Sequence, residues 1–116
     1  MLATYNTKLT DFDLRTFERV AQEARDASRD ISFYDRVGGC ARVYVKVGFE
    51  TMRQNSKYAK ALARAGFRVT RKPGETGVVI YVGYDNATGL QWAQGQAIAD
   101  AFNVNGIPAY KDAQED

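Results

Sequence analysis

The pattern of residues 42–47 constrains the fold more than any other stretch, because hydrophobic and polar side chains alternate there without interruption. The hydrophobic positions are Val43, Val45 and Val47, and the polar positions are Arg42, Tyr44 and Lys46. A period of two is typical of a β-strand that is buried on one side only. A strand needs partner strands for its backbone groups, so this segment predicts a sheet.

A helix and a second strand are predicted directly after this segment. Thr51 and Gln54 have the spacing of a capping box, which predicts a helix over residues 52–65. Gly66 fits the left-handed position that ends such a helix. Residues 67–72 alternate again, which predicts a second strand.

The second half of the chain repeats this order. The predicted elements are a turn, a hydrophobic strand, a helix and a final strand, at residues 73–77, 78–84, 89–102 and 107–110. Thr88 and Gln91 repeat the capping-box spacing before the helix. Asn105 and Gly106 predict a turn, and Pro108 favours an edge position for the last strand.

The order strand, helix, strand, strand, helix, strand predicts an α+β fold of the ferredoxin-like βαββαβ (split βαβ) type, with an antiparallel sheet. An amphipathic helix over residues 11–28 precedes it, with Leu14, Phe17, Ala21 and Ala24 on one face. Residues 30–39 receive no assignment. We therefore expect a single domain over residues 1–116, in three parts. These are an N-terminal helix and connector, the βαββαβ unit, and a frayed acidic tail, at residues 1–40, 41–110 and 111–116.

The charge of the chain is strongly polarised. Residues 42–72 hold nine basic side chains and one acidic one, a net charge of +8. Residues 1–41 have a net charge of −1 and residues 73–116 a net charge of −5, so the overall +2 conceals the asymmetry. Such a distribution indicates an anionic partner and says nothing about the fold.

Part of this charge forms a stripe on the first predicted helix of the βαββαβ unit. The spacing of four, three and four residues places four cations on one face: Arg53, Lys57, Lys60 and Arg64. The other side of the helix, with Ala59, Leu62 and Ala63, is expected to pack on the sheet. The stripe is interpreted either as a surface that contacts phosphates or an acidic protein, or as a solvated outer face.

The remaining charge falls on one predicted face of the sheet. That face would present Arg42, Tyr44, Lys46, Arg68, Thr70, Lys72 and Tyr81. Tyrosines among cations suit stacking and phosphate neutralisation on single-stranded nucleic acid, and RNA-recognition domains place aromatic groups comparably. Residues 76–83 lack the leading basic residue and paired aromatics of that family's motif, so the likeness is one of topology. In the alternative arrangement the N-terminal helix covers this face, and Tyr44 and Tyr81 belong to the core.

Few residues point to catalysis. Histidine is absent and Cys40 is the only cysteine, which excludes an intrachain disulfide, a Cys/His zinc site and Ser-His or Cys-His triads. Asp85 and Asn86 follow a strand, where capping explains them as well as chemistry does. Trp92 is interpreted as an exposed contact or as a residue packed under the N-terminal segment. We expect no cofactor, no metal and no enzymatic activity.

The predicted function is therefore that of a small binding protein. The basic stripe and the adjoining hairpin residues Arg71 and Lys72 are expected to bind a polyanion, most simply DNA or RNA. The alternative is a protein-interaction module, such as a virus-encoded inhibitor or accessory factor that docks on an acidic protein surface, or a self-associating structural protein. Residues 78–82 form the longest apolar run, too short to cross a bilayer, so a cytoplasmic protein without a membrane partner is expected.

Overall fold

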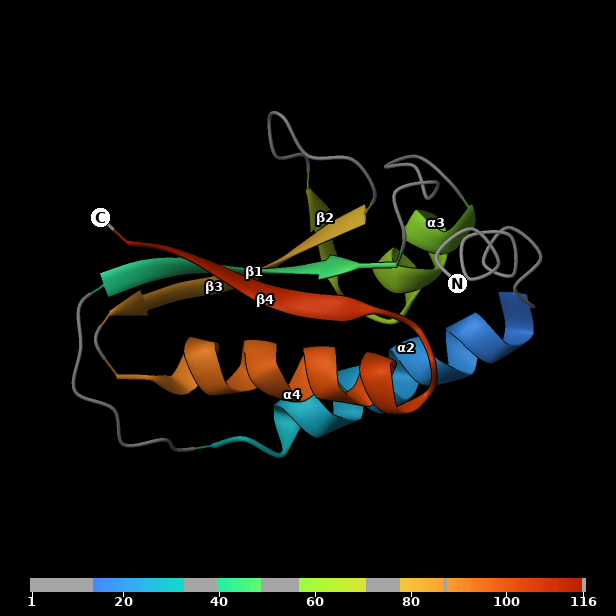
Figure 1. Ribbon diagram of the computed structural model, residues 1–116, viewed down its shortest axis with the longest axis horizontal. Coiled ribbons are helices and arrows are strands. Elements are labelled where there is room, and N and C mark those ends of the chain that lie inside the picture. The colour runs from blue at the N-terminus through green and yellow to red at the C-terminus, as the bar shows by residue number, and fades with distance from the viewer. Residues whose placement is uncertain (1–13, 33–39, 49–56, 71–77, 87, 116) are drawn as a thin grey trace.

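The computed structural model describes residues 14–32, 40–48, 57–70, 78–86 and 88–115. Within these ranges the chain is an α+β protein with three helices and one four-stranded antiparallel sheet (Figure 1). The helices are α2 (Leu14–Arg29), α3 (Lys57–Arg64) and α4 (Leu90–Val104). The strands are β1 (Cys40–Val47), β2 (Arg68–Thr70), β3 (Val78–Asn86) and β4 (Ala109–Glu115). None of the described helices has the length and apolar character needed to cross a membrane.

Several predictions lie outside the described residues. They concern the capping box of Thr51 and Gln54, the first part of the helix predicted over residues 52–65, the start of the helix predicted over residues 11–28, and the turn at residues 73–77. The cations Arg53, Arg71 and Lys72 also fall outside the described ranges.

The sheet has the strand order β2-β3-β1-β4, and every neighbouring pair is antiparallel. The last strand is longer than predicted, because β4 pairs with β1 from Ala109 to Glu115. The acidic tail is therefore part of the sheet as far as Glu115, and the expectation that it frays was wrong there. Strand β1 offers a partner along its whole length, and pairing with it satisfies backbone groups of the tail.

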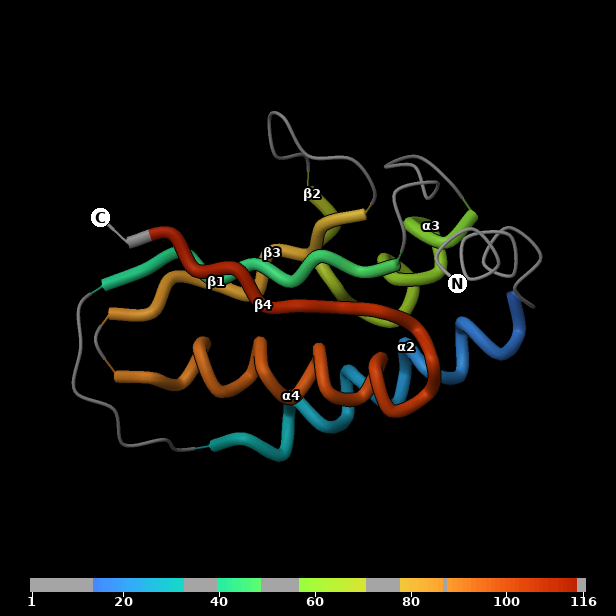
Figure 2. The backbone as a smooth tube through the Cα atoms, viewed as in Figure 1, coloured from blue at the N-terminus to red at the C-terminus, as the bar shows by residue number. Residues whose placement is uncertain are grey.

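The three helices lie on one side of the sheet and at its end (Figure 1). Helix α4 packs against β1, β3 and β4, and α2 runs beside α4 in the opposite direction (Figure 2). The ring of Phe17 on α2 lies 5.0 Å from that of Tyr58 on α3 and 5.9 Å from that of Phe102 on α4, measured between centroids. The N-terminal helix thus joins the helical layer and does not cover the other face of the sheet.

Helices α3 and α4 end in the same way. In α3, Gly66 has φ of 102° and the N–H of Phe67 donates to the carbonyl of Leu62 at 3.0 Å. In α4, Gly106 has φ of 83° and the N–H of Ile107 donates to the carbonyl of Phe102 at 3.0 Å. Both ends are Schellman motifs, and the two apolar side chains that flank each motif are buried. The predicted end of the first helix at Gly66 is confirmed.

The buried side of α3 differs from the prediction. Ala59 and Leu62 are buried as expected, but Ala63 is exposed and Tyr58 is buried in its place. The contact between the rings of Tyr58 and Phe17 explains the difference, because it turns the helix toward α2. The spacing alone could not reveal this contact, since α2 had no assigned position.

A β-bulge interrupts the pairing of β1 with β3. Val43 pairs with Gly83 and Tyr44 pairs with Tyr81, so Val82 is the extra residue. Before the bulge, Ile80 lies opposite Val45 on the helical side, as predicted. After the bulge the alternation is inverted, which places Tyr84 opposite Arg42 on the other side of the sheet and Asp85 toward the helices.

Candidate functional site

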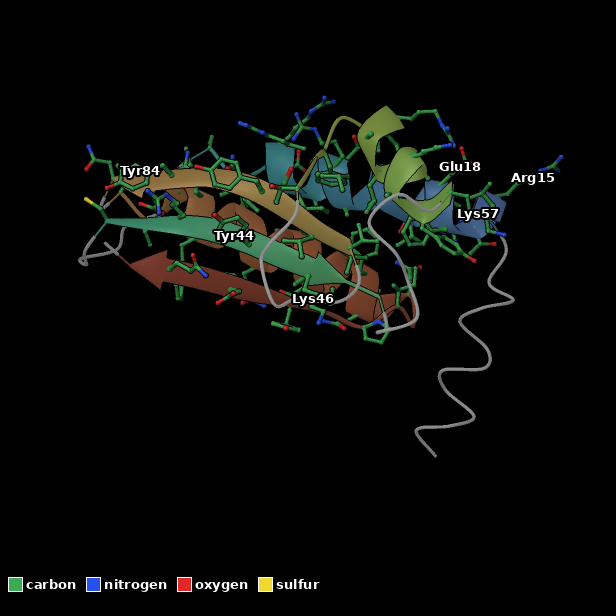
Figure 3. The ribbon with its side chains drawn as sticks, turned by 90° about the horizontal axis from the view of Figure 1, so that it is seen from above. Arg15, Glu18, Tyr44, Lys46, Lys57 and Tyr84 are labelled. Carbon is green, nitrogen blue, oxygen red and sulfur yellow. The ribbon has the colours of Figure 1, made fainter. Side chains whose placement is uncertain are left out.

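The candidate site is the side of the sheet on which none of the described helices lies, and we call it the open sheet face. The pairing places the following residues on it: Arg42, Tyr44, Lys46, Arg68, Thr70, Val79, Tyr81, Tyr84, Asn86, Tyr110, Asp112 and Gln114. None of the described helices covers this face, which Figure 3 views from above. The structure therefore brings together six residues predicted for it and adds two tyrosines.

The centre of the open sheet face is an aromatic pair with arginines beside it. The rings of Tyr44 and Tyr81 have centroids 5.3 Å apart and an interplanar angle of 54°. The guanidinium carbon of Arg68 lies 5.4 Å from the centroid of the Tyr81 ring. These side chains, together with Arg42 and Thr70, line a hollow of about 290 Å³. Both tyrosines are half-buried, so part of each ring stays accessible.

Two further tyrosines extend the aromatic surface across the sheet. Tyr84 is 43% exposed and lies opposite Arg42, and Tyr110 is 51% exposed and lies opposite Lys46. Each of them thus sits beside a cation of β1. Strict alternation would have placed Tyr84 toward the helices, and only Gly83 within the strand pointed to a bulge.

The open sheet face is basic in its described part. It carries Arg42, Lys46 and Arg68 against the single carboxylate of Asp112 on β4. Val79 is buried, with an exposed fraction of 2%, and lies opposite Lys46 and Thr70 in the pairing. The accessible surface therefore combines aromatic rings and positive charge.

The basic stripe lies on α3, outside the open sheet face, and part of its positive charge is compensated. Lys57, Lys60 and Arg64 are exposed on α3, but Arg64 forms an ion pair with Glu18 of α2 at 3.4 Å. Figure 3 shows Lys57 at the same end of the molecule as Glu18, whereas Tyr84 lies at the opposite end. Glu18 belongs to a helix that is far from α3 in the sequence, so the spacing of residues within α3 could not reveal this ion pair.

Asp85 holds the start of α4. It is fully buried, and its carboxylate accepts the N–H groups of Gly89 at 2.8 Å and Trp92 at 3.0 Å and the hydroxyl of Thr88 at 3.3 Å. Burial by itself raises the pKa of this carboxyl group, but these hydrogen bonds outweigh it, so the pKa lies below that of an ordinary aspartate. The observed contacts of Asp85 are structural.

The predicted capping box before α4 is replaced by this arrangement. The helix begins after Gly89, which has φ of 81° and no capping side chain. The hydroxyl of Thr88 accepts the N–H of Leu90 at 3.2 Å, and the carboxylate of Asp85 supplies the remaining contacts. A carboxylate is the stronger acceptor, which explains why it displaces the predicted cap.

The other residues considered for chemistry have structural partners. The thiol of Cys40 lies 3.0 Å from the side-chain oxygen of Asn86. The ammonium group of Lys111 on β4 lies 3.5 Å from the centre of the Trp92 ring, so Trp92 packs against β4. Within the described ranges, no group of three or more His, Cys, Asp or Glu side chains could hold a metal ion.

Comparisons of the chain with protein-family models, curated proteins and solved structures gave no match. The function must therefore be argued from the geometry of the open sheet face and from its charge.

Proposed function

We propose that this chain is a small non-enzymatic binding protein whose open sheet face binds single-stranded nucleic acid. The observation that carries the proposal is the pair of Tyr44 and Tyr81 beside Arg42 and Arg68 on a face that no described helix covers. Exposed tyrosine rings stack on bases of any sequence, and guanidinium groups neutralise the adjoining phosphates.

The arrangement of the tyrosines suits a single nucleic-acid strand that runs across the β-sheet. Tyr81, Tyr44 and Tyr110 lie on the neighbouring strands β3, β1 and β4. Neighbouring strands lie about 4.8 Å apart, and Tyr110 lies opposite Lys46, two residues along β1 from Tyr44, so the three rings form a diagonal row across the face. A base pair in a duplex hides both of its faces in the stack, and this favours a single strand as the ligand.

We also propose that the fold is of the ferredoxin-like type. The strand order, the two strand-helix-strand units and the matching ends of α3 and α4 support this assignment. RNA-recognition domains bind bases on the aromatic groups of a four-stranded sheet, and β3 and β1 hold the central positions here. This likeness to RNA-recognition domains is an analogy of fold.

Binding of labelled single-stranded and double-stranded oligonucleotides, followed by fluorescence anisotropy, tests the proposal. We expect the single strand to bind more tightly. Tyr44→Ala should weaken its binding by about 5-fold to 150-fold, because stacking on an aromatic ring contributes about 1 to 3 kcal/mol per base.

Tyr44→Phe is the matched control, since it keeps the ring, and it should bind close to the unmodified level. The proposal fails if no oligonucleotide binds at low salt or if Tyr44→Ala binds like the unmodified protein.

An acidic protein surface is the second candidate partner, and the position of Lys57 and Lys60 favours it. Both lysines are exposed on α3, and Figure 3 shows Lys57 at the end of the molecule away from Tyr84. Binding of a polyglutamate peptide that is lost in Lys57→Glu/Lys60→Glu but kept in Tyr44→Ala would support this partner. Loss in Tyr44→Ala alone would count against it.

A further inference from the structure

A second cavity, of about 330 Å³, lies at the edge of the sheet behind β3. Its lining comes from the C-terminal half of α2, the turn after α3, β3 and α4. Phe67, Ile80 and Ile98 supply an apolar floor, and all three are buried. Cavities of this size commonly hold small ligands.

Three arginines line this cavity, which we call the arginine pocket. Arg25 and Arg29 come from α2, and Arg68 comes from β2. No carboxylate is present among the described lining residues. Unlike Arg64, which is paired with Glu18, these three arginines line a space without a described counter-charge.

Arg25 is positioned by the turn that ends α3. Its guanidinium carbon lies 5.7 Å from the centre of the Phe67 ring. A Cβ atom at Gly66 would lie 3.3 Å from the Nε atom of Arg25, so the glycine permits this close approach. The Nε atom is buried and has no hydrogen-bond partner among the described residues. A buried N–H donor without an acceptor is unfavourable, and the charge of an anion in the pocket would offset part of that cost.

The arginine pocket adjoins the open sheet face. Arg68 and Tyr81 line both the pocket and the hollow between Tyr44 and Tyr81. Strand β2 pairs with β3 only from Val79 to Tyr81, so the two shared residues lie where β2 begins. A chain that leaves the open sheet face at Tyr81 would reach Arg25 and Arg29 next.

We infer that the arginine pocket binds a nucleotide through its phosphate group. Guanidinium groups form paired hydrogen bonds with phosphate oxygens, and the apolar floor suits a ribose or a base. The nucleotide is either free or part of a strand bound on the open sheet face, and only the second source rests on the proposed function.

Nuclear magnetic resonance of the ¹⁵N-labelled chain tests this inference through the arginine Nε–H signals. The probes are inorganic phosphate, adenosine monophosphate and a single-stranded oligonucleotide. We expect at least one of the nucleotides to shift the Arg25 signal, which Arg25→Lys identifies by its loss. Arg29→Glu should weaken that binding by about tenfold or more, because it reverses one of the three positive charges that line the pocket.

The matched control is Arg15→Glu, which makes the same change on the same helix. Arg15 precedes Arg29 by 14 residues, which corresponds to about 21 Å along a helix. It should alter binding less than twofold. Circular dichroism of both variants shows whether α2 is retained. If Arg29→Glu fails to fold, Arg29→Gln at the same exposed position replaces it.

The outcomes separate this inference from the proposed function. Binding of adenosine monophosphate that depends on Arg29 supports a free nucleotide, even if no oligonucleotide binds. Binding of the oligonucleotide alone, weakened separately by Tyr44→Ala and Arg29→Glu, supports a continuing strand. Overturning results are an Arg25 signal that no nucleotide moves, or equal affinities of Arg29→Glu and Arg15→Glu.

Discussion

Asp85 shows how one side chain joins the sheet to the helical layer. Its carboxylate sits at the end of β3 and accepts the N–H groups of Gly89 and Trp92 at the start of α4. In an isolated helix these donors would rely on a neighbouring cap, whereas here a strand supplies the acceptor. Helix α4 therefore depends on the sheet for its first turn.

We expect Asp85→Asn to lower the free energy of unfolding by about 2 kcal/mol at pH 7, because it weakens charge-assisted hydrogen bonds to buried donors. The lowered pKa of Asp85 gives the sign of the pH dependence. The stabilisation is complete well above the pKa of an unfolded aspartate, about 3.9, and is lost as the pH falls below it through the folded value.

Urea unfolding of both proteins from pH 7 to pH 2.5 measures this effect. The difference between them should shrink below about pH 4. A constant difference across this range would show that Asp85 titrates equally in the folded and unfolded states.

Helices α3 and α4 both end in a Schellman motif with the same pattern of residues. Each has a glycine with positive φ between two buried apolar residues, Leu62 and Phe67 in one and Phe102 and Ile107 in the other. Only their surroundings differ, because the space around Gly106 is open and Gly66 faces Arg25. The pair therefore separates backbone strain from side-chain crowding.

Gly106→Ala should lower the free energy of unfolding by about 1 to 2 kcal/mol, the cost of a left-handed conformation for a residue with a Cβ atom. Gly66→Ala should cost more, since its Cβ atom must also displace Arg25. Thermal unfolding compares the two variants. Equal losses would mean that Arg25 moves aside freely.

The difference in burial between the two sides of α3 predicts how substitutions on this helix affect stability. Leu62→Ala should lower the free energy of unfolding by about 2 to 5 kcal/mol, because Leu62 is fully buried. The exposed Lys60→Ala should stay within about 0.5 kcal/mol. Chemical denaturation measures both, and similar small losses would place Leu62 outside the core.

For the molecule as a whole, the helices and the proposed binding surface occupy separate sides of the sheet. The described open sheet face carries three cations, Arg42, Lys46 and Arg68. If each contacts a phosphate, the logarithm of the association constant for a single strand should fall with the logarithm of salt concentration with a slope of about −2.

Arg42→Gln should reduce the magnitude of this slope by about 0.7, which a salt series of anisotropy titrations measures. A slope near zero would exclude phosphate contacts. A slope much steeper than −2 would show that cations beyond these three take part, such as those of the stripe on α3.

The sequence predicted what depends on local period and turn chemistry. The alternation of residues 42–47 identified both faces of β1, and Gly66 identified the end of α3. It could not locate α2, because an apolar stripe shows that a helix is covered and not which surface covers it. The arginine pocket was also beyond prediction, since Arg25, Arg68 and Gln94 are distant in sequence and meet only through the position of α2.

The bulge at Val82 has a consequence for which substitutions the strand tolerates. Up to Tyr81 the residues on the open sheet face are the odd-numbered ones, and from Tyr84 onward they are the even-numbered ones. If the strand kept Val82 but paired without the bulge, Val82 would lie opposite Val43, so the ring of Tyr84 would turn toward the helices and the carboxylate of Asp85 away from them. One inserted residue thus ties the composition of the ligand surface to the integrity of a helix on the opposite side, so neither can change through that position without the other.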